Sequence, residues 1–481
     1  MEHQLLIGKY TLESLTSGLY VSPLDLYREY IQNAADSIDE AIESEIIENS
    51  AAVIHISINS ERGEISILDN GTGVSTNMVL SRLIDIGNSQ KRHTSNRGFR
   101  GIGRLSGLGY CQKLVFKTSA IGEHVASEIE YDSESLQKLL SPQLNNQDSV
   151  EDVLQKVVKV IQGPEKENSH YFLVVLKGVP RDSILLDYQT VLEYLRQNLP
   201  LPFANDFVWG SIIHQKLADY GVSLAEYNVK FSYNGAEIQL YKPYENYVLS
   251  DRVRRIEDNI SDVQFREFKI DNGLSALLWY AETNFYGTVL NNAIKGIRVR
   301  QGNIVIGGKN LLKSCFKEER FNGWLVGELH VFDERMIPNT RRDDYEKNVA
   351  YVKLREEISA WATEISKQIR HKSYMRSLTE NERSVIKGNR SEATLVEAKI
   401  SSEDELDDMD ESESVAQEGL INSLSILLNM GKKATRYNIL NLNSKMTVEQ
   451  KNTVAHVFDI LYDTYPENEA NDIARSIVEN F

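Results

Sequence analysis

The chain has 481 residues, of which 41% are hydrophobic and 26% charged, and its formal net charge is −17. This length predicts about two to four domains, and the acidic balance argues against a wholly basic nucleic-acid-binding surface, although a local basic groove stays open. Two cysteines, Cys111 and Cys315, are too few for a disulfide framework or a zinc site, and no apolar run approaches the roughly 18 residues of a membrane span, so we expect a cytoplasmic protein without a membrane segment.

Two helices come first in the chain. Residues 11–20 have apolar side chains at helical spacing, and a second helix is predicted over about 23–44. Within the second helix Glu29, Asn33 and Asp36 stand at i, i+4 and i+7, so their side chains fall within roughly 60° of one another. Apolar residues flank this polar stripe. The pattern is typical of a helix whose polar side faces a cleft.

A β-hairpin is predicted next. Residues 52–58 and 64–69 alternate apolar and polar side chains around a glycine-bearing turn. The second strand ends at Asp69, which could accept a hydrogen bond from the exocyclic amine of a base. Gly71 and Gly73 follow, and without side chains they would let a flat base lie against the backbone.

A glycine-rich segment follows a short helix predicted at about 76–86 and a polar stretch that contains Lys91. The segment begins at Gly98 and includes Gly101 and Gly103. Glycine is used where the backbone adopts positive φ or approaches a ligand closely. The sequence has no P-loop motif, and this segment is preceded by polar residues where a dinucleotide fingerprint requires a strand.

The remainder of the first half contains two more predicted strands, 113–119 and 171–176, separated by a polar, helical insertion at 133–163. A helix at 188–198 then runs into a Leu-Pro-Leu-Pro stretch at 199–202. We take this stretch as the end of the first domain, because proline interrupts regular structure.

A second α/β domain is predicted after this boundary. Its expected elements are a hairpin with an Asn-Gly turn at 229–240, strands at 276–280, 297–300 and 327–332, and a long helix at about 343–371.

The C-terminal part begins with an acidic linker region, in which residues 403–413 contain eight carboxylates. Beyond it, 415–429 and 447–480 have helical apolar spacing, which predicts a small helical module. The predicted domains are therefore 1–202, 203–375, an acidic linker region at 376–414, and a helical module at 415–481.

The polar residues near the N-terminus predict a particular chemistry when they are taken together. Asn33 offers an amide oxygen of the kind that Mg²⁺ binds while sharing its other positions with water and phosphate. Glu29, one turn earlier, would lie near a terminal phosphate and could orient or deprotonate a water. Each feature alone is typical of an ordinary helix or turn. Their order and spacing indicate a nucleotide site.

These motifs resemble the GHKL ATPase superfamily, which includes gyrase, the ninety-kilodalton heat-shock chaperones, histidine kinases and MutL. The stretch from Leu19 to Ile38 is especially similar to the first helices of the heat-shock chaperones, whereas Gly98-Phe99-Arg100-Gly101 is similar to MutL. Taken together, the motifs also resemble MORC proteins. The resemblance covers roughly residues 5–200 and, more loosely, 203–375. It implies a two-layer α/β (α+β) sandwich of the Bergerat type with a mixed sheet, followed by a transducer or middle domain.

The resemblance also implies roles for individual residues. These are Glu29 as the catalytic general base, Asn33 as the Mg²⁺ ligand, Asp36 as a supporting residue, Asp69 as the adenine contact, Gly71 and Gly73 as the lining of the base pocket, and Gly98, Gly101 and Gly103 as the phosphate-side lid. Residues 338–343 are similar to a loop that carries a γ-phosphate-sensing arginine, with Arg341 slightly preferred over Arg342. The alternative is that these arginines bind the acidic surface. Lys91 is a further candidate phosphate contact, and Ser169-His170 replaces the Gly-Thr that these families commonly have before the strand at 171–176.

By this resemblance the protein is an ATPase that uses Mg²⁺ and acts as a molecular clamp, with lid closure and dimerisation of the first domains driven by ATP. A chaperone-like role on a protein client, a DNA-transaction role, and a role in bacterial antiviral defence all stay open. A histidine kinase is disfavoured, because its ATPase domain follows a dimerisation helix pair, whereas here the ATP-site helix begins near residue 23. The alternative from another class is a nucleotide-gated scaffold with little turnover, which Glu29 disfavours because a pure binder needs no base.

Overall fold

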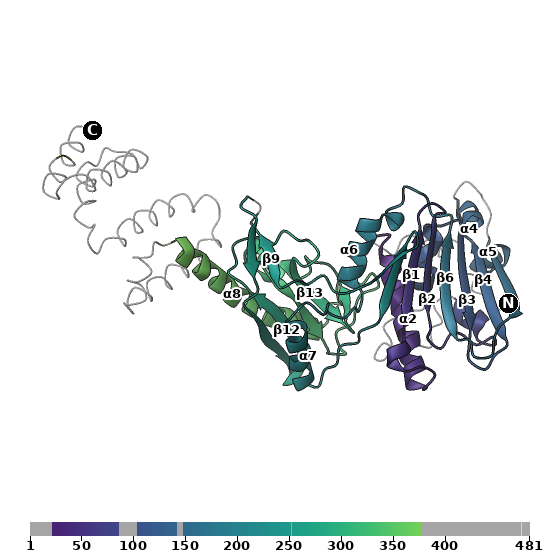
Figure 1. Ribbon diagram of the computed structural model, residues 1–481, viewed down its shortest axis with the longest axis horizontal. Coiled ribbons are helices and arrows are strands. Elements are labelled where there is room, and N and C mark those ends of the chain that lie inside the picture. Colours follow the sequence, from purple (N-terminus) through teal and green to yellow (C-terminus); the bar gives the residue numbers. More distant parts are fainter. Residues whose placement is uncertain (1–21, 86–102, 142–147, 252, 378–472, 474–481) are drawn as a thin grey trace, which may run out of the picture. The chain divides into compact units, whose positions relative to one another are not determined.

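The computed structural model describes residues 22–85, 103–141, 148–251, 253–377 and residue 473 (Figure 1). By its internal contacts the chain divides into two compact units, Met1–Arg376 and Ser377–Phe481. Several predictions of the sequence fall outside the described residues, namely the helix at 11–20, the phosphate-side residues Lys91, Gly98 and Gly101, the acidic stretch at 403–413 and the helices at 415–429 and 447–480.

The first sheet has eight strands in the order β5-β4-β3-β6-β2-β1-β7-β8 (Figure 1). Their bounds are β1 Ile54–Asn59, β2 Glu64–Asp69, β3 Lys113–Ser119, β4 Val125–Asp132, β5 Val158–Pro164, β6 Tyr171–Lys177, β7 Val229–Tyr233 and β8 Ala236–Gln239. Strands β1 and β7 pair in parallel, and every other neighbouring pair is antiparallel. The sheet is therefore mixed, as the sequence predicted.

Helices cover one face of this sheet. Ile54 and Ile56 of β1 and Ile65 and Ile67 of β2 are buried beneath them, whereas Leu68, between two buried positions, is 37% exposed. This alternation confirms the predicted two-layer sandwich, because one face of the sheet packs and the other faces solvent. The helices of this part are α2 Asp25–Glu43, α3 Val79–Leu83, α4 Ser133–Leu140, α5 Val150–Val157 and α6 Tyr188–Asn198, with short 3₁₀ helices η1 Asn49–Ala51, η2 Gly103–Gly109 and η3 Ile184–Leu186.

The prediction of a helical insertion at 133–163 was only partly right. This segment forms α4 and α5, but its last residues form the edge strand β5, and the preceding strand β4 was not predicted at all. In β5 most residues are exposed, including Val160 and Ile161. An edge strand with no buried face has no apolar alternation to reveal it.

The hairpin predicted at 229–240 forms, but it lies in the first sheet. Its strand β7 pairs in parallel with β1, with Ile54 opposite Val229. Val229 and Phe231 complete the core under α2. The chain beyond the Leu-Pro-Leu-Pro stretch thus contributes two strands, β7 and β8, to the first sheet.

A second sheet has five strands in the order β11-β12-β15-β13-β14. The bounds of its strands and neighbours are α7 Gly210–Asp219, β9 Tyr247–Ser250, β10 Ile256–Asn259, β11 Asp262–Ile270, β12 Gly273–Glu282, β13 Gly296–Gln301, β14 Ile304–Ile306, η4 Lys313–Cys315, η5 Glu319–Trp324, β15 Val326–Val331 and α8 Val349–Ser377. Helix α8 packs on one face, with Leu354 and Ile358 against Val299 and Leu329, and α7 packs on the other.

Helix α8 begins six residues later than the start predicted at 343. The Asn348 side chain accepts a hydrogen bond from the Tyr351 backbone N–H at 2.9 Å, which is the contact of an N-cap residue. Before it, Pro338 and Tyr345 form an isolated β-bridge. The segment with the two arginines is therefore a closed loop in front of the helix.

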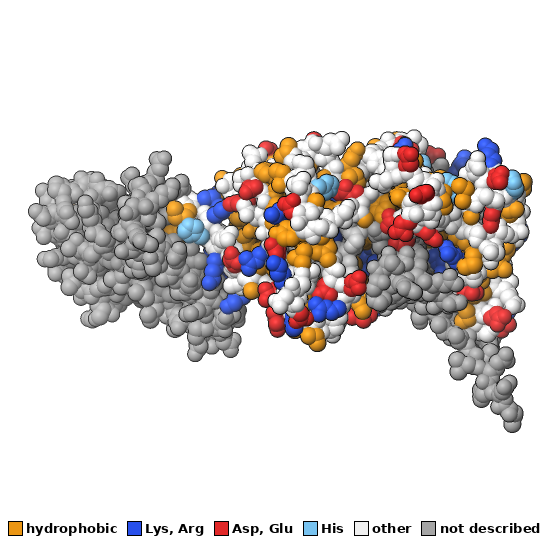
Figure 2. Space-filling view, turned by 90° about the horizontal axis from the view of Figure 1, so that it is seen from below, with side chains coloured by type: hydrophobic (Ala, Val, Ile, Leu, Met, Phe, Trp, Pro, Cys, Tyr) orange, Lys and Arg blue, Asp and Glu red, His pale blue; other side chains and the backbone are white. Residues whose placement is uncertain are grey.

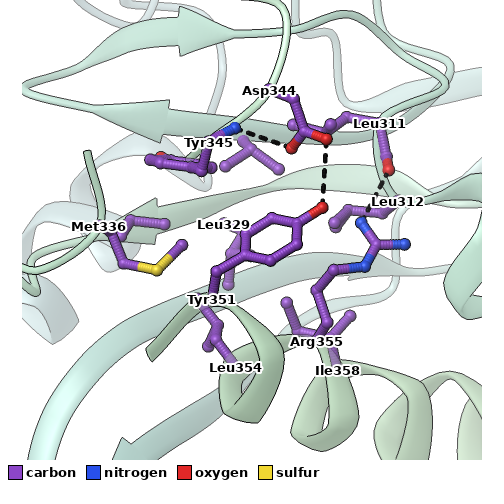
Figure 3. Close-up of a pocket in the computed structure, with 12 residues that line it drawn as sticks. Leu311, Leu312, Leu329, Met336, Asp344, Tyr345, Tyr351, Leu354, Arg355 and Ile358 are labelled. Carbon is purple, nitrogen blue, oxygen red and sulfur yellow. Dashed lines mark hydrogen bonds between the residues drawn. The ribbon is translucent and has the colours of Figure 1, made fainter. Parts of the chain in front are cut away.

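A small pocket lies between α8 and the second sheet (Figure 3), lined mainly by aliphatic side chains. At its rim the Tyr351 hydroxyl donates to the Asp344 carboxylate at 3.1 Å, and the Arg355 guanidinium donates to the Leu311 carbonyl at 3.4 Å. Tyr345 lines the same pocket, and its backbone N–H donates to Asp344 Oδ1 at 2.8 Å. The pocket reflects how α8 and the arginine loop are packed, and the predicted nucleotide residues lie elsewhere.

Candidate functional site

The polar stripe of α2 lies along the edge of the helix that the core does not cover. Glu29, Asn33 and Ser37 are half-buried at i, i+4 and i+8, whereas Tyr30 and Ala34 beside them are buried. Asp36, which the sequence placed on the same stripe, is only 5% exposed. The helix forms because its apolar residues repeat at helical spacing over β1 and β2, and this packing fixes the direction of the polar edge.

Glu29 lies directly against the end of the glycine-rich segment. A side chain added at Gly103 would place its Cβ 2.3 Å from Glu29 Oε2. The Tyr30 hydroxyl donates to the Arg104 carbonyl at 3.1 Å and accepts from the Gly107 N–H at 3.0 Å. The described end of the glycine-rich segment is therefore fastened to α2 one residue from the predicted base.

Arg28 connects Glu29 to two other parts of the site. Its guanidinium lies 3.6 Å from Glu29 Oε1 and 3.5 Å from Asp25 Oδ1, and it donates to the backbone carbonyl of Arg341 at 3.3 Å. The Arg28 side chain is 5% exposed, and both carboxylates are 13% exposed. In so little solvent a guanidinium holds carboxylates more firmly than at an open surface. The sequence pattern gave no signal for Arg28, since its partners are three residues before it, next to it and in a distant loop.

Asp69 closes a tight turn at the end of β2. Its Oδ1 accepts a hydrogen bond from the Gly71 N–H at 2.9 Å, and the carboxyl is 3% exposed. A Cβ at Gly71 would lie 2.2 Å from Ser37 Oγ, and the Thr72 N–H donates to the Ser37 carbonyl at 3.2 Å. The turn after β2 therefore packs against α2 two turns beyond Glu29, and glycine is required at 71 because nothing larger fits.

Gly73 approaches a third segment. It has φ of +65°, and a Cβ there would lie 2.0 Å from the Ser119 carbonyl oxygen. The next residue, Val74, donates its N–H to Thr118 Oγ1 at 2.8 Å, and this hydroxyl donates to the Tyr171 carbonyl. Thr118 therefore holds the turn after Gly73 in place. The sequence gave no sign of this contact, because a lone threonine within a strand carries no motif.

His170 contacts the same turn. Its Nδ1 lies 2.9 Å from the Gly71 carbonyl oxygen, at hydrogen-bond distance. The sequence singled out His170 only as part of the pair that replaces Gly-Thr, and the contact places its ring beside the predicted base pocket. The pair Ser169-His170, which directly precedes β6, therefore lies next to Gly71.

The two candidate arginines differ in their surroundings. Arg341 is exposed, and its backbone carbonyl is the group that Arg28 holds. Arg342 has a positive φ of 55°, and its carbonyl accepts the Gly307 N–H at 2.8 Å. The Arg341 backbone thus lies next to α2, whereas the Arg342 backbone is tied to the turn after β14.

Other kinds of site find little support in the part of the chain that the structure describes. No group of three or more His, Cys, Asp or Glu side chains that could hold a metal ion occurs there, and none of its helices is long and apolar enough to cross a membrane. Cys111 and Cys315 are both buried free thiols, and burial raises the pKa of Cys111 to about 12. A thiol that resists ionisation is a poor nucleophile.

A comparison with known protein families identifies the first part of the chain. Residues 28–159 match the family described as histidine kinase-, DNA gyrase B-, and HSP90-like ATPase. The match begins at the residue before Glu29 and ends in β5, so it includes the polar edge of α2, the turn after β2 and the glycine-rich segment. Because the description spans several groups, the closer likeness to heat-shock chaperones or to MutL stays a prediction.

Proposed function

Because residues 28–159 form an ATPase domain of the GHKL superfamily, we propose that this protein binds ATP along the polar edge of α2 and hydrolyses it to ADP and phosphate. The observation that carries the proposal is the convergence of two segments on α2. The glycine-rich segment reaches Glu29 through Gly103, and the turn after β2 reaches Ser37 through Gly71. These contacts give the site a phosphate end and a base end.

At the base end, Asp69 accepts a hydrogen bond from the exocyclic amine of adenine, and Gly71 and Gly73 line the base pocket. The low exposure of the Asp69 carboxyl supports this role, because a hydrogen bond in a desolvated site discriminates strongly against a ligand that lacks the donor. Asp36 supports the same pocket from α2.

At the phosphate end, Glu29 acts as the general base that orients and deprotonates the attacking water. Asn33, half-buried one turn later on the same edge, supplies an amide oxygen for Mg²⁺, which is the donor type that this ion takes alongside water and phosphate. When bound, Mg²⁺ neutralises charge on the phosphates. Gly98, Gly101 and Gly103 cover the phosphates as a lid, with Lys91 as a further phosphate contact.

Arg341 completes the site from the loop before α8. The hydrogen bond from Arg28 to its carbonyl supports this choice over Arg342, because it keeps the Arg341 backbone beside the residue that precedes Glu29. A guanidinium stabilises the charge that develops during phosphoryl transfer.

We infer that ATP binding closes the lid and joins two first domains, so that the protein acts as a clamp on a partner. A protein client is favoured over DNA by the net charge of −17 and by the face in Figure 2, where basic and acidic side chains of the described residues are interspersed. A role in bacterial defence and a scaffold with little turnover are the other candidates, and Glu29 beside the glycine-rich segment favours turnover.

The test separates binding from hydrolysis. Glu29→Ala is expected to bind ATP with near-normal affinity and to lose turnover by roughly 10²- to 10⁴-fold. Asp69→Asn is expected to lose ATP binding itself. Binding is measured by calorimetry with Mg·ATP, and turnover by phosphate release. Unchanged hydrolysis in Glu29→Ala would remove the assigned base, and near-normal affinity in Asp69→Asn would remove the adenine contact.

A further inference from the structure

Helix α6 places a tyrosine beside the charged residues at the start of α2. The Tyr194 hydroxyl donates to Asp25 Oδ1 at 2.9 Å. Tyr194 is half-buried, and the burial of its hydroxyl raises the pKa of Tyr194 well above its ordinary value of 10.0. It therefore stays a neutral hydrogen-bond donor throughout the physiological range.

The contact continues through charged groups to the predicted base. Asp25 Oδ1, which accepts from Tyr194, is also the oxygen that lies 3.5 Å from Arg28, and Arg28 in turn lies 3.6 Å from Glu29. Nη1 of Arg28 faces Asp25 and Nη2 faces Glu29, so one guanidinium lies between the two carboxylates. A hydrogen bond that fixes Asp25 in place keeps the guanidinium between the two carboxylates.

We propose that Tyr194 is a positioning residue for ATP hydrolysis, which acts through Asp25 and Arg28 on the orientation of Glu29 and on the approach of the Arg341 loop. The proposal rests on the proposed function, because it takes Glu29 as the base. Without the hydroxyl, Asp25 keeps the Ser22 N–H on Oδ2 at 3.3 Å but loses the donor to Oδ1, the oxygen that faces Arg28. We expect the Arg28 guanidinium to shift as a result, and with it the Glu29 carboxylate and the Arg341 carbonyl. Small misplacements of this kind lower the rate without weakening substrate binding.

The C-terminal end of α6, the helix that carries Tyr194, is held in place by hydrogen bonds from the second sheet. Arg300 of β13 donates to the carbonyl of Gln197 at 2.9 Å and to the carbonyl of Leu199 at 3.3 Å. These carbonyls lie at the C-terminus of α6, where the helix leaves its last acceptors unpaired and where a cation is favourable. The second sheet therefore holds α6 at one end, and Tyr194 presents its hydroxyl to Asp25 one turn before that end.

Tyr194→Phe tests the proposal because it removes only the hydroxyl. Its matched control is Tyr27→Phe, since the Tyr27 hydroxyl is also buried, comes from α2 itself, and donates to the Leu185 carbonyl at 2.7 Å without touching the three charged residues. In steady-state kinetics with Mg·ATP we expect Tyr194→Phe to lower kcat by roughly tenfold or more with little change in KM. Tyr27→Phe is expected to keep the kcat of the unmodified protein.

A double-mutant cycle distinguishes positioning from general loosening. Asp25→Asn should lower kcat as well, and Tyr194→Phe should add little to it, because both act through the same contact. Thermal unfolding of each variant shows whether the fold is kept. Equal kcat in Tyr194→Phe and Tyr27→Phe, or fully additive effects with Asp25→Asn, would overturn the proposal while leaving the ATPase in place. Glu29→Gln is measured in the same assay to test the proposed function itself. If it hydrolyses ATP as fast as the unmodified protein, Glu29 is not the base, and the proposed role of Tyr194 is removed as well.

Discussion

Glu328 lies in the interior of the second sheet with four hydrogen-bond donors around its carboxylate. Lys242 Nζ and His330 Nε2 lie 2.8 Å and 3.1 Å from Oε2. The Tyr244 hydroxyl donates to Oε1 at 3.0 Å, and the Arg300 guanidinium donates to the same oxygen. The Glu328 and Lys242 side chains have no exposed surface. Burial alone would raise the pKa of Glu328, but Arg300 and Lys242 hold it well below its ordinary value.

Glu328→Gln is therefore expected to destabilise the fold by about 3 to 5 kcal/mol at pH 7, because it leaves two buried cations without their anion. The stabilising effect of an ionised Glu328 is complete above its unfolded pKa of 4.5 and is lost as the pH falls toward its lower folded pKa. The difference in unfolding free energy between variant and unmodified protein should narrow below pH 4.5. Denaturant unfolding across this range measures it.

The control for this variant is Glu364→Gln. Glu364 pairs with Arg266 at 3.7 Å, and both side chains are about half exposed, at 55% and 49%. An exposed pair contributes little to stability, so this substitution should change the unfolding free energy only slightly at any pH. A Glu328→Gln protein as stable as Glu364→Gln would contradict the expectation.

At the scale of elements, the loop between β15 and α8 lets the two arginines be compared directly. Arg341→Ala is expected to lower kcat by roughly 10³-fold, the scale of an arginine that stabilises phosphoryl transfer. Arg342→Ala should have a much smaller effect on kcat, since the backbone at 342 is turned away to Gly307. Phosphate release under saturating Mg·ATP measures both. If Arg342→Ala lowered kcat more than Arg341→Ala does, Arg342 would be assigned the phosphate contact in place of Arg341.

Elements that carry their own periodicity were predictable from the sequence. Strands β2 and β3 and helix α6 lie at the predicted bounds, because alternation, turn residues and helical spacing are local signals. Sheet membership of the 229–240 hairpin was not predictable, since the pairing of β7 with β1 joins residues far apart in the chain. The candidate site shows the same division between local signals and contacts that only the fold creates. Glu29, Asn33 and Asp69 were visible as motif residues, whereas Arg28 and Tyr194 matter only through partners that the fold brings to them.

At the scale of the whole molecule, the clamp hypothesis predicts that the molar mass in solution doubles when ATP is bound and not hydrolysed. Glu29→Ala with Mg·ATP should behave as a dimer in light scattering, because a protein that binds ATP without hydrolysing it accumulates in the ATP state. The unmodified chain carries −17, and the loss of one carboxylate leaves the variant strongly acidic, so two chains repel one another. Dimerisation should therefore strengthen as salt rises toward about 0.15 M, where the Debye length is about 8 Å and only charges near the interface still interact.

Asp69→Asn under the same conditions is the matched control, since it also loses one carboxylate and is expected to keep the fold but not to bind ATP. It should keep the mass that it has without nucleotide at every salt concentration. If Glu29→Ala with ATP has this same mass while calorimetry shows that it binds ATP, association does not follow nucleotide binding. The ATPase would then drive a change within one chain, and the contact between Arg28 and the Arg341 loop would be the first place to look for it, because it joins the proposed nucleotide site on α2 to the segment before α8.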